Sequence, residues 1–163
     1  MTDLAFNIGL NFSRYYQSLA EKIQTLLSPL SDDQIWSRPY PYGNSIGHLL
    51  LHLTGNLNTY IGAQMANTGY VRDRDLEFTS QEYQPKESLL QAFANTMVMV
   101  QDTIAKQSPA DWSAPYAAKG MEDAGNRFTA FLRCAAHVDH HLGQMIYLRK
   151  EIERQAAHAK GAS

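Results

Sequence analysis

Residues 45–53 read SIGHLLLHL, and this stretch indicates most directly how the chain folds. Its apolar positions, continued by Leu57 and Ile61, recur every three or four residues, which is the spacing of a helix with one buried face. Asn44 or Ser45 can cap such a helix by accepting a hydrogen bond from one of its first free N–H groups. We therefore predict an amphipathic helix from residue 44 or 45 to about residue 69.

Three further segments repeat this apolar spacing. A helix is predicted before it over Asp3–Leu27, and two follow, from Pro85 to just before Ser108 and over Asn126–Gln155. Four long amphipathic helices without a strand signal predict an all-α fold, specifically a four-helix bundle. The first helix is expected to bury Leu4, Ile8, Phe12, Tyr15, Leu19, Ile23 and Leu26.

Two long connections separate the predicted helices. Residues 70–84 are polar and charged, and residues 108–125 contain prolines and glycines with few aliphatic side chains, so both are interpreted as loops. Residues 1–155 are expected to form a single domain. The small, polar residues 156–163 are expected to form a disordered or frayed tail.

Composition excludes several classes of function. Of the 163 residues, 44% are hydrophobic and 18% charged, and the net charge of −2 gives no reason to expect nucleic acid or an anionic membrane as partner. No apolar run approaches the roughly 18 residues that span a bilayer, and the N-terminus lacks the basic and apolar regions of a secretory signal. The single cysteine, Cys134, fits a reducing compartment, so a cytoplasmic protein is expected.

Five of the six histidines lie in two short clusters, residues 48–52 and 137–141, and each cluster has a pair four residues apart. Such a pair shares one helix face, and two imidazoles there plus one from a facing helix can hold three corners of a tetrahedral metal site. A lone histidine on an apolar face is usually a core residue, and this alternative stays open for His52 alone. No Glu-x-x-His occurs, which argues against a carboxylate-bridged di-iron bundle.

The order of these features resembles the DinB/YfiT-like superfamily of metal-dependent enzymes. After a first helix and Trp36, the chain shows Ser-Ile-x-x-Leu-Leu-x-His-Leu at residues 45–53 and His-x-x-x-His-x-Gly-Gln at residues 137–144. The likeness extends from about Leu4 to Glu151, and its second motif is the more specific. It implies an up-down-down-up bundle, frequently a homodimer, with zinc or nickel bound by His52, His137 and His141.

The resemblance also implies a class of activity. Characterised relatives include transferases and isomerases that use low-molecular-weight thiols, so we expect a metal-dependent thiol transferase or hydrolase acting on a small electrophilic substrate. Three neutral imidazoles with one vacant position suit such Lewis-acid chemistry. The alternative is a non-catalytic metal-binding or stress-associated bundle that acts through its dimer surface.

Other polar residues are candidates for the surroundings of the site. His48 shares a face with His52 and could be a fourth ligand or a proton shuttle, but we favour a solvated position near the helix start. His140 and Asp139 are expected to point away from the site. Asn56 and Gln144 could hold a ligand ring or a bound water, or simply pack between helices.

The two connections carry cations and tyrosines that could line the site. Arginine binds carboxylates with two parallel hydrogen bonds, so the cations could hold an acidic group of a thiol, although solvated loop charges are the simpler alternative. The tyrosines could line a pocket or only cover one end of the bundle. The cations are Arg72, Arg74, Lys119 and Arg127, and the tyrosines are Tyr40, Tyr42 and Tyr116.

Overall fold

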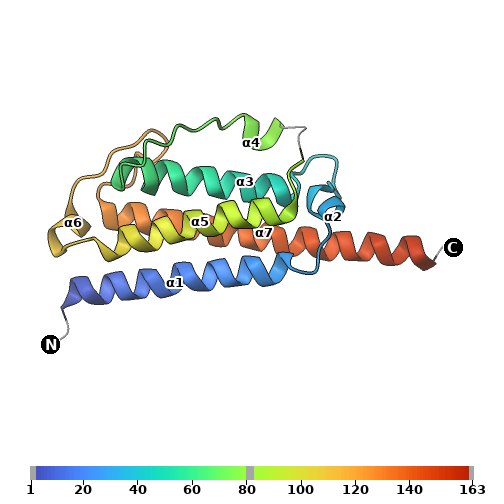
Figure 1. The fold of residues 1–163 in the computed structure, drawn as a ribbon, viewed down its shortest axis with the longest axis horizontal. Helices are drawn as coiled ribbons and strands as arrows, with labels where there is room; N and C mark the ends of the chain where they lie inside the picture. Colours follow the sequence, from blue (N-terminus) through green and yellow to red (C-terminus); the bar gives the residue numbers. More distant parts are fainter. Residues whose placement is uncertain (1–2, 80–82, 162–163) are drawn as a thin grey trace.

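The computed structural model describes residues 3–79 and 83–161, and within these ranges it is built of helices with no β-strand. Four long segments lie along one another (Figure 1): α1 (Leu4–Leu27), α3 (Ile46–Leu57), α5 (Lys86–Ala105) and α7 (Arg127–Gly161). In this view α1 and α7 run from left to right, whereas α3 and α5 run from right to left. The prediction of an all-α fold is confirmed. Across the described ranges, no helix has the length and apolar character needed to cross a membrane.

Short helices interrupt the connections between the long ones. These are α2 (Asp32–Trp36), α4 (Leu76–Thr79) and α6 (Pro109–Ser113), and the last two lie in segments predicted to be loops. Helix α6 begins at a capping box, in which the Ser108 hydroxyl accepts from Asp111 N–H and the Asp111 side chain accepts from Ser108 N–H. Helices of four or five residues are too short to show an apolar period, so α4 and α6 were not predicted from the sequence.

The second long helix changes its winding. Residues Asn58–Ala63 form a π-helix, η1, directly after α3. The Tyr60 carbonyl oxygen accepts a hydrogen bond from the Tyr116 hydroxyl at 2.9 Å. The predicted single α-helix to about residue 69 is therefore an α-helix to Leu57 followed by a π-helical turn.

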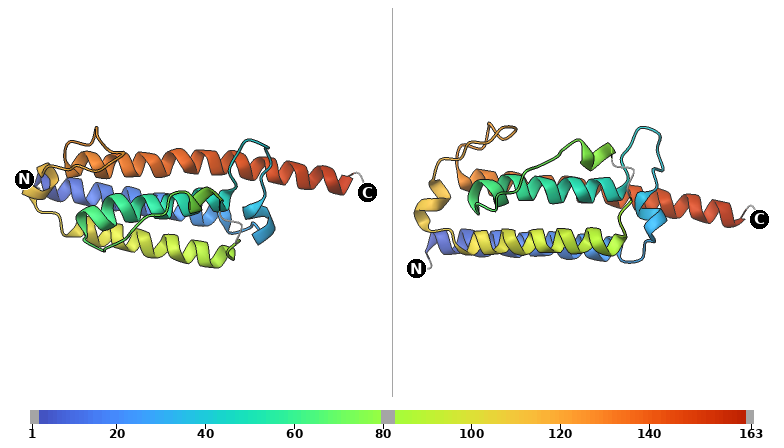
Figure 2. Two further views of the ribbon diagram at one scale, coloured as in Figure 1. Left: turned by 90° about the horizontal axis from the view of Figure 1, so that it is seen from above. Right: turned by 45° about the horizontal axis from the view of Figure 1, so that its top comes forward.

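The last helix is longer than predicted. Helix α7 continues to Gly161, so the residues expected to form a tail from position 156 continue the helix, and residues 162–163 lie outside the described part. Figure 2 shows that the C-terminal part of α7 extends beyond the ends of the other long helices.

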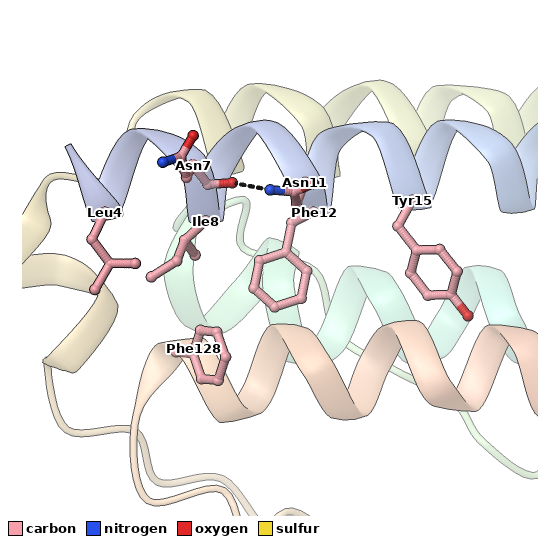
Figure 3. Close-up of a pocket in the computed structure, with 7 residues that line it drawn as sticks. All are labelled: Leu4, Asn7, Ile8, Asn11, Phe12, Tyr15 and Phe128. Carbon is pink, nitrogen blue, oxygen red and sulfur yellow. Dashed lines mark hydrogen bonds between the residues drawn. The ribbon is translucent and has the colours of Figure 1, made fainter. Parts of the chain in front are cut away.

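The buried face of α1 is rotated slightly from the predicted one. Tyr16 is fully buried and donates its hydroxyl hydrogen to the Phe131 carbonyl at 2.8 Å, whereas Tyr15 is exposed. The same rotation of the buried face places Leu27 fully in the core, whereas Leu26 is only partly buried. Near the start of α1, side chains extend toward α7, and the Phe12 and Phe128 rings lie 5.5 Å apart (Figure 3).

Candidate metal centre

Three histidines from two helices meet in the bundle. His52 comes from α3, and His137 and His141 come from consecutive turns of α7. One ring nitrogen of each lies within 4.8 Å of the others, and His52 Nε2 is 2.9 Å from His137 Nε2. The spacing of four residues places the His137 and His141 rings 4.4 Å apart on one face of α7. We call His52, His137 and His141 the triad.

The surroundings of His137 and His141 favour neutral imidazoles. Burial, followed by the nearby charges of His141 and His52, lowers the pKa of His137 to about 3. Burial also lowers the pKa of His141, against the opposing effect of a hydrogen bond with Gln144. Neutral imidazole is the form that binds a metal, because its second nitrogen keeps a free lone pair.

One nitrogen of the triad has no partner. His141 Nε2 is buried, and no hydrogen bond reaches it from anywhere in residues 3–79 and 83–161. A buried polar atom without a partner is costly, and it is rare in a folded protein unless an ion, water or ligand completes the site. The donor set and this unsatisfied nitrogen therefore fit a divalent ion that prefers imidazole ligands.

The other nitrogen of His52 is held by a buried carboxylate that was not predicted from the sequence. Glu77 from α4 is buried, and its Oε2 lies 2.8 Å from His52 Nδ1. Burial raises the pKa of Glu77, but hydrogen bonds from His52 and Arg72 together with the charge of Arg72 outweigh it and lower that pKa overall. Because an ionised carboxylate can only accept, Nδ1 carries the proton and donates, which leaves Nε2 as the lone-pair nitrogen.

Arg72 and Gly55 complete the support of Glu77. Arg72 binds both carboxylate oxygens, with Nε 2.6 Å from Oε1 and Nη2 2.7 Å from Oε2. A Cβ atom at Gly55 would overlap Glu77 Oε1 and lie 3.3 Å from Arg72 Nε. Position 55, in the last turn of α3, must therefore be glycine for the carboxylate to approach the helix backbone this closely.

The α7 half of the site has a simpler support. Gln144 Oε1 lies 2.7 Å from His141 Nδ1, so the amide oxygen accepts the Nδ1 proton and leaves Nε2 facing the triad. The predicted role of Gln144 in holding a ring therefore agrees with its position. Asn56 is buried one turn after His52, but no hydrogen bond joins it to the triad among the described residues.

Comparison with known proteins identifies the family. The sequence model of a family described as a protein of unknown function, DUF1572, matches residues 10–159. The chain belongs to the DUF1572 family. A crystal structure of a conserved protein from Enterococcus faecalis has a TM-score of 0.71 with 15% identity, over 88% of this chain and 95% of that one. At this identity the likeness shows the fold alone, and no protein of curated function matches.

His48 is not solvated in this DUF1572 protein, which corrects the expectation that we favoured. It is fully buried, its Nδ1 lies 2.5 Å from the Ser45 hydroxyl, and its Nε2 lies 3.4 Å from Arg38 Nη2. Trp36 packs edge-on against its ring at 5.2 Å. His48 is also outside the group of nitrogens that converge on one point. The first turn of a helix is exposed on average, but here the α2 segment covers it.

The cations expected at the site divide into two groups. Arg72 joins the Glu77 network, and the Arg74 guanidinium lies 5.7 Å above the Phe78 ring, which is itself 5.0 Å from the His52 ring. Arg127 instead bonds to Gln107 and Asp111 beside α6, so it supports the fold there.

The three tyrosines expected near the site also fall into two groups. Tyr40 and Tyr42 stack at 5.7 Å beside an open cavity of about 600 Å³ that Gln144 and His140 also line. Tyr116 is buried and bonded to the Tyr60 carbonyl, which makes it a packing residue. Asp139 and His140 are both exposed on α7. His140 does not point away from the site as expected, because its Nε2 lies 3.2 Å from Gln144 Nε2 and its ring lies 5.1 Å from the His141 ring.

Proposed function

We propose that this DUF1572 protein is a divalent-metal-binding protein of the DinB-like type, with one zinc or nickel ion held by His52, His137 and His141. The observation that carries the proposal is the convergence of three ring nitrogens within 4.8 Å, one of them buried without a hydrogen-bond partner among the described residues. The directions of α1, α3, α5 and α7 are consistent with an up-down-down-up four-helix bundle (Figure 1). Imidazole nitrogens suit both zinc and nickel.

The donor set favours a catalytic ion over a structural one. Structural zinc sites are closed by four protein ligands, whereas catalytic sites have three and keep one position for water or substrate. Among the described residues the convergent group contains three histidines and no carboxylate or thiolate. Glu77 lies on the Nδ1 side of His52, away from the point where the Nε2 atoms meet.

We infer a thiol transferase or hydrolase that acts on a small electrophilic substrate in the cytoplasm. When bound, such an ion would act as a Lewis acid that favours the deprotonated form of a water or a low-molecular-weight thiol. The residues of this chain orient two of the imidazoles, because Glu77 and Gln144 accept the Nδ1 protons of His52 and His141. Burial lowers the pKa of His137 and of His141 and so favours their neutral forms. Arg74, over Phe78, is the predicted cation best placed to bind an acidic group of a thiol.

A second candidate function is supported by one surface feature. Leu4, Ile8, Tyr15 and Phe128 border an open apolar hollow of about 350 Å³ between α1 and the start of α7 (Figure 3). Leu4 is 73% exposed. Exposed apolar side chains grouped in this way are typical of interaction surfaces. This face supports a homodimer, and with it the alternative of a non-catalytic metal-binding or stress-associated bundle that acts through its dimer surface.

The test is metal analysis of protein purified without an affinity tag, followed by titration with Zn²⁺ and Ni²⁺. We expect one ion per chain. Failure of the native protein to bind either ion would rule the proposal out. A thiol-transfer assay with several low-molecular-weight thiols, and a hydrolysis assay, then separate the candidates: turnover that chelation abolishes supports the enzyme, and metal binding without turnover supports the non-catalytic bundle.

A further inference from the structure

Residues 70–79, which we call the strap, cross over α3 on their way to the end of α4 (Figure 1). The strap contributes no side chain to the hydrophobic core, and no partly buried apolar side chain of it packs against that core. Val71 and Leu76 are exposed. The only buried side chain in the strap is Glu77, a carboxylate. The strap is therefore attached to the bundle mainly by polar contacts, and apolar burial contributes little.

These polar contacts are concentrated on one ligand of the triad. Glu77 Oε2 is 2.8 Å from His52 Nδ1, and Arg72, also in the strap, holds both oxygens of that carboxylate. The Phe78 ring packs at 5.0 Å from the His52 ring. Within the part of the chain that the structure describes, Arg38 also donates a 3.4 Å hydrogen bond to the Phe78 carbonyl. Most of what holds the strap in place is thus contact with His52 itself.

We propose that Glu77 is the positioning residue of the metal centre, and that through it the docking of the strap and the binding of the ion stabilise each other. Glu77 holds His52 as the tautomer with its proton on Nδ1 and turns Nε2 toward His137 and His141. An ion requires the same tautomer and ring orientation, because it binds the Nε2 lone pair. Two events that favour one arrangement of a shared group are coupled, and the coupling is reciprocal.

The glycine in α3 is a second, independent sign of this role. A side chain at position 55 would occupy the place of Glu77 Oε1. Glycine weakens a helix interior relative to alanine, so its presence here is explained by the approach of the carboxylate. The inference deepens the proposed function and rests on it, since it concerns the same ion.

The test compares Glu77→Ala and Glu77→Gln with Asp75→Asn, an exposed change of one charge in the same strap. Zinc affinity is measured by competition with a chromophoric chelator, and strap dynamics by hydrogen–deuterium exchange with and without zinc. We expect Glu77→Ala to bind zinc about 10- to 100-fold more weakly, the range for loss of a ligand's supporting hydrogen bond. In the native protein zinc should slow exchange of the strap amides, and in Glu77→Ala it should not.

Two further measurements separate positioning from a general loss of structure. Histidine NMR shifts should report the Nδ1–H tautomer of His52 in the native protein and its loss in Glu77→Ala. Gly55→Ala should reproduce the loss of zinc affinity although Glu77 is intact, whereas Gly143→Ala should not, because a Cβ at Gly143 meets open space on α7. Circular dichroism confirms that each variant is folded.

The outcomes distinguish this inference from the proposed function. Native zinc affinity in Glu77→Ala, or strap exchange that zinc leaves unchanged in the native protein, would overturn the inference while the metal site stands. Absence of zinc binding by the native protein would overturn both. Weakened binding in Glu77→Ala and Gly55→Ala, with native binding in Asp75→Asn and Gly143→Ala, supports the inference.

Discussion

The two halves of the triad are built differently. On α3, His52 is 6% exposed and is held by the buried carboxylate of Glu77, which Arg72 binds in turn; these residues come from another segment, 25 and 20 residues further along the chain. On α7, His137 and His141 are partly exposed, four residues apart, and the support of His141 is Gln144 in the same helix. One half depends on tertiary contacts and the other on helical geometry, so mutations should affect the two halves to different extents.

The largest effect is expected from removing a ligand in either half. His52→Ala and His137→Ala should each abolish most zinc binding, because two imidazoles leave the ion without a third protein ligand. His158→Ala, at an exposed position 17 residues beyond His141 on α7, is the control and should bind zinc normally. Equal loss in His158→Ala and His137→Ala, measured by metal analysis, would contradict the ligand assignment.

The same pair of variants should differ in stability. His52→Ala removes one hydrogen bond to the buried Glu77 carboxylate, which still binds Arg72, and a hydrogen bond to a charged group contributes about 1.5–3 kcal/mol. Among the described residues, no carboxylate is hydrogen-bonded to His137. Urea unfolding without metal should therefore show the larger loss in His52→Ala, and equal losses would remove the proposed difference between the halves.

This difference also explains what the sequence could and could not predict. The i, i+4 pair on α7 follows from residue spacing, and so does the support by Gln144, because both lie within two turns of one helix. The partnership of His52 with Glu77 does not, because it joins residues in different elements and Glu77 lies in a segment whose polarity indicated a loop. The need for Gly55 becomes visible only once Glu77 is placed against α3.

The fold shows the same division between local and tertiary information. Apolar spacing predicted the long helices, and the ends of α1 and α5 lie within a residue or two of the expected ones. Tyr15 and Tyr16 both fit the apolar spacing between Phe12 and Leu19, and Tyr15 was predicted to be the buried one. Tyr16 is buried instead, and its hydroxyl donates to the Phe131 carbonyl of α7, a contact that spacing along α1 cannot show. The prediction that His48 is solvated was likewise wrong. Trp36 of the short helix α2 packs against its ring, and residue spacing within one helix does not show a contact with another element.

The pH dependence of stability should report the α7 half. The folded pKa of His137, about 3, lies below the ordinary value of about 6.5 that applies to the unfolded chain. Between these values the unfolded chain binds a proton that the folded chain does not, so stability is greatest above pH 6.5 and falls as pH drops toward 3. The contribution of His137 to this slope should stay below about 1.4 kcal/mol per pH unit, the limit for one proton, and the lowered pKa of His141 adds to it in the same direction.

Urea unfolding of the metal-free protein at pH 7 and pH 5 measures this slope. His137→Ala should flatten it, and the exposed His158→Ala should not. A native protein that is as stable at pH 5 as at pH 7 would show that the triad is not held neutral by its surroundings.

A smaller effect is expected from Gln144→Ala. The amide of Gln144 orients His141 through Nδ1, but it is exposed, so water can replace it as the acceptor. We expect zinc affinity to fall by at most about 10-fold, the low end of the range for such supports and less than for Glu77→Ala. Asp139→Asn, exposed on the opposite side of α7, should bind as the native protein does. A loss in Gln144→Ala larger than in Glu77→Ala would reverse the comparison between the halves.

The smallest effect is expected on the fold as a whole when metal is removed. The core is a continuous set of apolar side chains from all four long helices, and each buried Leu or Ile stabilises the fold by about 1.5–3 kcal/mol relative to exposure. Neither the strap nor the triad belongs to that core, so exhaustive chelation should leave the circular dichroism of the helices unchanged. Metal should then add stability by mass action alone, about 2.7 kcal/mol at a free concentration 100 times the Kd.

If chelation melted the helices, the ion would be structural, and the argument for a position kept open for substrate would lose its support. If chelation instead changed only the exchange of the strap amides, the effect of the ion would be confined to the α3 half of the site, where Glu77 connects it to the strap.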